Sequence, residues 1–113
     1  MINFVFLSLF SLFMVGCASK QIYYWGNYQD LLYLQSKEPG KANPQYQIEK
    51  MEADVERAKS KNLPLPPGFY AHLGYQYLLA GNATKANAGF EIEKKRFPES
   101  AKLMNRFTKK IKR

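Results

Sequence analysis

Apolar residues recur along most of this chain every three to four positions, which is the period of an α-helix. Within residues 20–36 the positions i, i+4, i+7 and i+8 carry Tyr24, Tyr28, Leu31 and Leu32. The same period recurs twice more, in Ile48, Met51, Val55 and Ala58, and in Leu103, Met104, Phe107 and Ile111. With a hairpin at residues 67–100, these stripes predict an all-α fold of about five helices: two hairpins and a closing helix at 99–113.

Proline, glycine and asparagine mark where the predicted helices begin and end. After a loop containing Pro39 and Gly40, Asn43 is a predicted N-cap and Pro44 the first residue of a helix that runs to about residue 60. Prolines recur within residues 62–68 and predict a stiff, extended spacer between the hairpins. The motif Ala80-Gly81-Asn82 predicts a helix end in a left-handed turn, followed by a capped helix start.

The chain begins with an almost continuous apolar run over residues 2–15. A membrane-spanning helix needs about 20 apolar residues, so this run has the length of the hydrophobic region of a secretory signal. It ends in Met14-Val15-Gly16-Cys17, which resembles the lipobox of bacterial lipoproteins. The run departs from that pattern in having Met where Leu is commoner and in lacking any preceding Lys or Arg.

The lipobox resemblance implies that residues 1–16 are a signal peptide, cleaved after Gly16, and that Cys17 carries a covalent lipid. The mature chain would then be a lipid-anchored helical domain of residues 17–113. Ala18 follows the cysteine where Asp would favour the inner membrane, so the resemblance implies the outer membrane, facing the periplasm. The alternative is an ordinary buried cysteine in an N-terminal helix.

The segment 67–100 has the 34-residue length of a tetratricopeptide repeat and resembles one in sequence. The matching positions are Tyr70, Leu73, Gly74 and Tyr77 on its first helix, Ala86 and Phe90 on its second, and the terminal Pro98. Gly74 and Ala86 are small, which lets the two helices approach closely. Glu93 departs from the family, where Ala is usual. One repeat cannot bury its faces alone, so the hairpin at 20–60 is expected to be a degenerate partner.

Two motifs together resemble a family of short, uncharacterised proteobacterial lipoproteins: Tyr-Tyr-Trp-Gly-Asn-Tyr at 23–28 and the run from Pro66 to Tyr75. The resemblance implies an outer-membrane lipoprotein whose biochemical role is unknown. It also implies a gene neighbour that encodes a lipoprotein similar to the curli secretion-channel component. We therefore expect an accessory, protein-interaction subunit of an envelope assembly.

Tetratricopeptide repeats bind peptides or partner helices on their concave side. By that resemblance the groove-facing residues are Ala71, Tyr75 and Leu78, with Gly68 at the rim. Tyr75 is the strongest candidate, because aromatic side chains dominate interface energies. The alternative is that Tyr75 packs on the first hairpin.

The net charge of +8 arises entirely from the last twenty residues, because basic and acidic residues balance over positions 1–93. The basic residues of this end are Lys94, Lys95, Arg96, Lys102, Arg106, Lys109, Lys110, Lys112 and Arg113. They make an anionic envelope surface an alternative partner: phospholipid, lipid A or cell-wall polymer. A solvated, frayed basic terminus explains them equally simply. Nucleic acid is not expected, because an exported protein does not meet it.

Candidate catalytic chemistry is sparse in this sequence. The single Cys rules out a disulfide framework and a cysteine zinc cage, and the single His, His72, lacks a neighbouring Asp or Ser constellation. Glu49, Glu52 and Glu56 are interpreted as a solvated helix face with nearby Lys and Arg. We expect a protein that is not an enzyme, with no metal site, no small-molecule substrate and no cofactor beyond the lipid.

Overall fold

The computed structural model describes residues 21–112, so Gly16, Cys17 and Arg113 lie outside the described residues. Over this range the chain is all-α, as predicted, with no strand. Its α-helices are α2 (Tyr28–Lys37), α3 (Pro44–Ser60), α4 (Phe69–Leu79), α5 (Ala83–Arg96) and α6 (Ala101–Ile111). Two short 3-10 helices, η2 (Pro39–Lys41) and η3 (Pro98–Ser100), precede α3 and α6.

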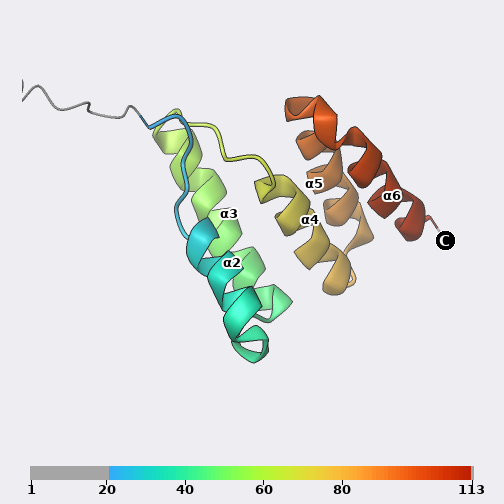
Figure 1. Ribbon diagram of the computed structural model, residues 1–113, viewed down its shortest axis with the longest axis horizontal. Coiled ribbons are helices and arrows are strands. Elements are labelled where there is room, and N and C mark those ends of the chain that lie inside the picture. Colours follow the sequence, from blue (N-terminus) through green and yellow to red (C-terminus); the bar gives the residue numbers. More distant parts are fainter. Residues whose placement is uncertain (1–20, 113) are drawn as a thin grey trace, which may run out of the picture.

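Figure 1 shows the helices as a row of two hairpins and a closing helix. The first hairpin is α2 with α3, the second is α4 with α5, and α6 lies against the second hairpin. Helix α4 packs on α5 and also on α3, so it joins the two hairpins. Among residues 21–112, no helix has the length and apolar character needed to cross a membrane.

Helix α2 is shorter than predicted, since it begins at Tyr28 and not near residue 20. Gly26 has a φ of +47°, outside the helical region, and a Cβ at this position would collide with the Asp54 carboxylate. The Tyr24 N–H donates to the Pro64 carbonyl at 2.8 Å, so this segment is bound to residues 61–68, the linker between the two hairpins. Tyr24 therefore precedes the helix, although its spacing fits the helical stripe.

The predicted starts of α3 and α5 and the turn after α4 are confirmed, whereas α6 begins at Ala101 and not at residue 99, after the 3-10 helix η3. The side chain of Asn43 accepts a hydrogen bond from the Tyr46 N–H at 2.9 Å, and Pro44 is the first residue of α3. Asn82 accepts from the Lys85 N–H at 3.1 Å at the start of α5. Gly81 has a φ of +82°, the left-handed conformation expected after α4.

Helices α4 and α5 approach closely because small residues lie between them. A Cβ on Gly74 would lie 2.9 Å from the Ala86 carbonyl oxygen and 2.8 Å from the Phe90 ring, which confirms the predicted contact. Gly89 faces it from α5, where a Cβ would lie 3.1 Å from the Gly74 Cα and 3.0 Å from the Tyr70 carbonyl oxygen. The sequence interpretation had not included Gly89.

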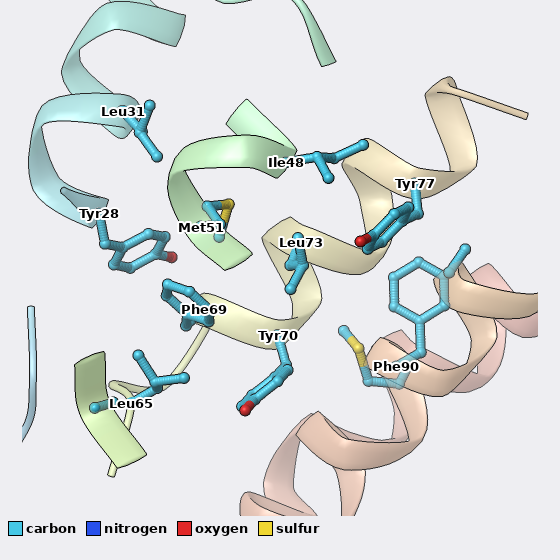
Figure 2. Close-up of a cluster of buried hydrophobic side chains, with 13 residues drawn as sticks. Tyr28, Leu31, Ile48, Met51, Leu65, Phe69, Tyr70, Leu73, Tyr77 and Phe90 are labelled. Atoms are coloured by element: carbon cyan, nitrogen blue, oxygen red, sulfur yellow. The ribbon is translucent and has the colours of Figure 1, made fainter. Parts of the chain in front are cut away.

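The core runs through both hairpins and continues beneath α6. Figure 2 shows its aromatic and aliphatic side chains converging from α2, α3, the linker, α4 and α5. From α6, Met104 is buried and the Phe107 ring stacks on Phe90 with centroids 5.1 Å apart. Leu103 was expected on the same apolar stripe, but it is 51% exposed at the edge of α6.

Candidate functional site

A groove lies between the two hairpins, with a volume of about 460 Å³. Its floor is α4, and α3 and α5 form its walls. We call it the inter-hairpin groove; its lining residues are Glu52, Val55 and Lys59 of α3, Tyr70, Leu73 and Tyr77 of α4, and Lys85, Ala88, Gly89, Ile92 and Arg96 of α5.

The groove continues past the C-terminal end of α3 into a second hollow of about 620 Å³. Val55, Lys59, Tyr70 and Arg96 line both spaces. The remaining lining residues come from the segment before α2, the end of α3, the linker and the end of α5: Tyr23, Ala58, Asn62, Leu63, Pro64, Leu65 and Phe97. This end of the groove has mainly apolar and aromatic walls and two cationic side chains.

Two cationic side chains that line the inter-hairpin groove lie over the rings of the tyrosines in its floor. The Arg96 guanidinium carbon is 5.0 Å from the centroid of the Tyr70 ring. The Lys85 ammonium is 5.3 Å from the centroid of the Tyr77 ring. Each ring face attracts its cation and restricts its position, and the N–H donors of both cations can bind an anion.

The one carboxylate that lines the inter-hairpin groove is already engaged. The Tyr77 hydroxyl donates to the Glu52 Oε1 at 2.7 Å and so joins α4 to α3. Burial, this hydrogen bond and the Glu52 charge together raise the pKa of Tyr77 to about 12. Because the neutral hydroxyl is the donor, the link is present at neutral pH.

Glu93 binds the N-terminus of α4. It is 3% exposed, and its Oε1 accepts the Gly68 N–H at 2.7 Å, so an acidic residue of α5 caps α4. Its Oε2 is buried without a hydrogen-bond partner among the described residues. Burial, and secondarily the Glu93 charge, raise the pKa of Tyr28. The departure of Glu93 from the repeat pattern thus has a structural role.

His72 belongs to a polar cluster between α3 and α4. Its Nε2 is hydrogen-bonded to Oε1 of the fully buried Gln47, and the Gln47 amide donates to Gln35 Oε1 at 2.7 Å and to the Ala42 carbonyl at 2.6 Å. Burial lowers the pKa of His72, so the imidazole is neutral at neutral pH. The ring thus links α4 to α3.

The residues expected to face a partner lie on another side of α4. Ala71 and Leu78 are partly buried against the core, and Gly68 is the N-cap residue. Tyr75 is 39% exposed, and its ring lies 6.0 Å from that of Phe107, so it contacts α6. At 100° per residue, these positions point away from the side of α4 that floors the groove.

The basic residues of the C-terminal end have different surroundings. Lys94 pairs with Glu91 at 3.0 Å, and Arg96 lines the groove. The spacing of Lys102, Arg106 and Lys109 places them on one face of α6, and all three are exposed. The other exposed members are Lys95, Lys110 and Lys112.

The carboxylates of α3 have separate roles. Glu56 is 3.4 Å from the Lys59 ammonium, with both side chains exposed, and Glu49 is exposed as well. Across residues 21–112, no three His, Cys, Asp or Glu side chains group as metal ligands would. The most constrained carboxylate is Asp54, which is fully buried and which the sequence interpretation did not single out.

A family model matches residues 22–107, a segment that contains both hairpins and most of α6. The chain belongs to the DUF4810 family, described as a domain of unknown function. No curated protein and no solved structure gave a significant match. All residues that line the inter-hairpin groove lie within the matched segment.

Sequence reasoning missed the inter-hairpin groove. It assigned Tyr70 and Tyr77 only to packing within a repeat, and it counted Arg96 among a basic terminus. The available signal was the spacing of Lys85, Ile92 and Arg96, which share one side of α5. Lys59 lies in another hairpin, so its position across from Arg96 depended on how the hairpins pack.

Proposed function

We propose that this protein is a non-enzymatic interaction subunit of an envelope assembly, held at the outer membrane by a lipid on Cys17 and facing the periplasm. In this proposal, residues 1–16 are removed and the two hairpins act as a tetratricopeptide-like binding module. The lipobox and repeat resemblances support the anchor and the module. The lipoprotein similar to the curli secretion-channel component is the first candidate partner.

The inter-hairpin groove is the observation that carries the proposal. It is open along three helices, and Tyr70, Tyr77 and Arg96 line it. Tyrosine and arginine are among the side chains that most often dominate binding energy in protein interfaces. The sequence-based expectation adds Tyr75 with Ala71, Leu78 and Gly68 as a second contact region, on the side of α4 near α6.

The proposal is tested by photocrosslinking in intact cells that produce the full chain. A photoreactive residue replaces Ile92 in the groove wall or, in a second variant, Tyr75 on the side of α4 near α6. The matched control carries it at Gln45, which is exposed on α3 and does not line the groove. We expect a discrete crosslinked protein from position 92, identified by mass spectrometry, and none from position 45. The proposal fails if positions 92 and 75 both yield no discrete product.

The anchor is tested separately by labelling with radioactive palmitate. The wild-type chain should take up label and fractionate with the outer membrane, and Cys17→Ser should do neither. Label on Cys17→Ser would contradict lipidation at this cysteine. The interaction test remains valid in that case, because the crosslinking positions lie in the folded domain.

Binding to an anionic envelope surface is the second candidate function. The observation that favours it is the exposed face of α6 that carries Lys102, Arg106 and Lys109. Replacing all three with Gln should abolish salt-sensitive binding to phosphatidylcholine vesicles that contain phosphatidylglycerol. Binding that is indifferent to ionic strength, or unchanged in the triple variant, would exclude this function.

A further inference from the structure

We propose that the inter-hairpin groove binds an extended, acidic segment of the partner protein, with one carboxylate at Arg96 and Lys59 and another at Lys85. This inference rests on the proposed function and names the chemistry of the partner. An apolar side chain of the segment would lie between the two carboxylates, against Val55 and Ile92.

Charge complementarity selects an acidic occupant. Three cationic side chains line the groove, at Lys59, Lys85 and Arg96, against the single carboxylate of Glu52. The Glu52 Oε1 accepts the Tyr77 hydroxyl. Lys59 pairs with Glu56, but both side chains are more than two-thirds exposed, so the pair is screened and readily exchanged for another carboxylate.

Arg96 and Lys85 are positioned but not neutralised. Each lies over a tyrosine ring, and neither forms an ion pair with an acidic residue of the range 21–112. The guanidinium carbon of Arg96 lies 5.0 Å from the centroid of the Tyr70 ring, so the ring restricts its position. The guanidinium N–H groups are the donors that bind a carboxylate in a two-point contact. A pre-positioned arginine loses less side-chain entropy on binding.

The spacing of the cations matches an extended peptide. Lys85 and Arg96 are at positions i and i+11 of one helix, which separates them by about 16 Å along its axis. An extended chain covers about 3.3 Å per residue, so about five residues span that distance. Between them α5 presents the exposed side chains of Ala88 and Ile92, and the small Ala88 leaves room for a peptide backbone.

The experiment measures peptide binding to the full-length protein in a mild non-ionic detergent by fluorescence anisotropy. The probe is a fluorescein-labelled peptide with two Glu residues five positions apart and Leu between them. The matched control peptide has Gln at both Glu positions. We expect the wild-type protein to bind the Glu peptide at least about tenfold more tightly than the Gln peptide, since two charge-assisted contacts are lost.

Variants of the protein locate the binding. Arg96→Gln and Lys59→Gln should each weaken binding of the Glu peptide about tenfold, and Lys85→Gln should weaken it less, because Glu52 is nearby. Lys95→Gln is the matched control, since Lys95 adjoins Arg96 on α5, is exposed, and does not line the groove. Arg96→Glu should weaken binding of the Glu peptide more than Arg96→Gln does, because it places a negative charge where the peptide carboxylate binds.

Several outcomes would overturn the inference. Equal losses in Arg96→Gln and Lys95→Gln would show general charge attraction, and unchanged binding in Arg96→Gln would exclude the groove. If a second copy of this protein occupied the groove, the protein would form a dimer and Arg96→Glu would dissociate it. A groove that takes lipid would bind phosphatidylglycerol vesicles in an Arg96-dependent way and would not bind the peptide.

The two proposals fail in different ways. If position 92 crosslinks to a partner but Arg96→Glu leaves that product unchanged, the interaction subunit stands and the acidic-segment inference is wrong. If the Glu peptide binds as expected but no position crosslinks to a protein in cells, the chemistry of the groove stands and the proposed envelope role is wrong.

Discussion

Asp54 of α3 binds Asn27 at the start of α2 through both of its carboxylate oxygens. Its Oδ2 accepts the Asn27 N–H at 2.9 Å and its Oδ1 accepts the Asn27 side-chain amide at 3.0 Å. Burial raises the pKa of the Asp54 carboxyl, although the bonds from Asn27 oppose this rise. A carboxylate from α3 thus caps α2, and Gly26 makes room for it.

Replacing Asp54 should destabilise the first hairpin. Asp54→Ala leaves both Asn27 donors without their acceptors, and we expect it to lower the free energy of unfolding by about 2–4 kcal/mol. Urea unfolding, monitored by circular dichroism, measures this change in the free energy of unfolding. Asp30→Ala is the control, because Asp30 is exposed in the first turn of α2 and its loss should cost about 0.5 kcal/mol. Equal losses would show that the contact between Asp54 and Asn27 does not hold α2.

The hydrogen bond between Tyr77 and Glu52 predicts that the protein loses stability at alkaline pH. The pKa of Tyr77 is raised to about 12 in the folded protein from an ordinary 10.0, so the stability it contributes is fully present below pH 10. That contribution is lost as the pH rises through about 12. The difference in unfolding free energy between wild type and Tyr77→Phe should therefore shrink over this range.

Tyrosinate absorbance provides the direct check on Tyr77. Tyr77→Phe should remove a tyrosine that titrates late, and Glu52→Gln should move that titration to lower pH, because the acceptor no longer carries a charge. If Glu52→Gln leaves the titration curve of the folded protein unchanged, the link between α3 and α4 does not set the pKa of Tyr77.

Gly74 should not tolerate a methyl group. In Gly74→Ala the new Cβ would lie 2.9 Å from the Ala86 carbonyl oxygen, and backbone cannot move aside as easily as a side chain. We expect a loss of about 1–3 kcal/mol in unfolding free energy, larger than the gain of about 1 kcal/mol in helix propensity. Gly40→Ala is the control, since nothing lies within 4 Å of its built Cβ, and it should be close to neutral. A stabilised Gly74→Ala variant would contradict the close approach of α4 and α5.

Replacing Tyr75 tests whether the partner binds the side of α4 that the repeat resemblance indicates. Tyr75→Ala should cost about 1 kcal/mol of stability, because its ring is 39% exposed and its aromatic contact is with Phe107. We expect the variant to stay folded and to capture less of the partner in the crosslinking experiment. Phe107→Ala is the contrast, and it should destabilise the fold by about 3 kcal/mol through loss of stacking on Phe90. Unchanged capture in Tyr75→Ala would exclude this side and leave the groove as the docking surface.

Local sequence determined most of the helices. The helical period predicted the apolar stripes of α3 and α6. Asn43, Gly81 and Asn82 lie at helix boundaries, as their residue types predicted. These features depend on contacts within a few residues, such as the hydrogen bond from the Tyr46 N–H to Asn43. Short-range interactions of this kind do not require knowledge of how the hairpins pack.

Contacts between residues that are far apart in the sequence determined the features that local patterns did not predict. The start of α2 depends on Asp54, 27 positions from Asn27, and the cap of α4 depends on Glu93, 25 positions from Gly68. By itself the sequence determined an all-α chain with most of its helix boundaries and a basic C-terminal end. Only the tertiary structure placed Lys59 and Arg96 in the lining of one groove, because the packing of one hairpin on the other is not encoded in any local pattern.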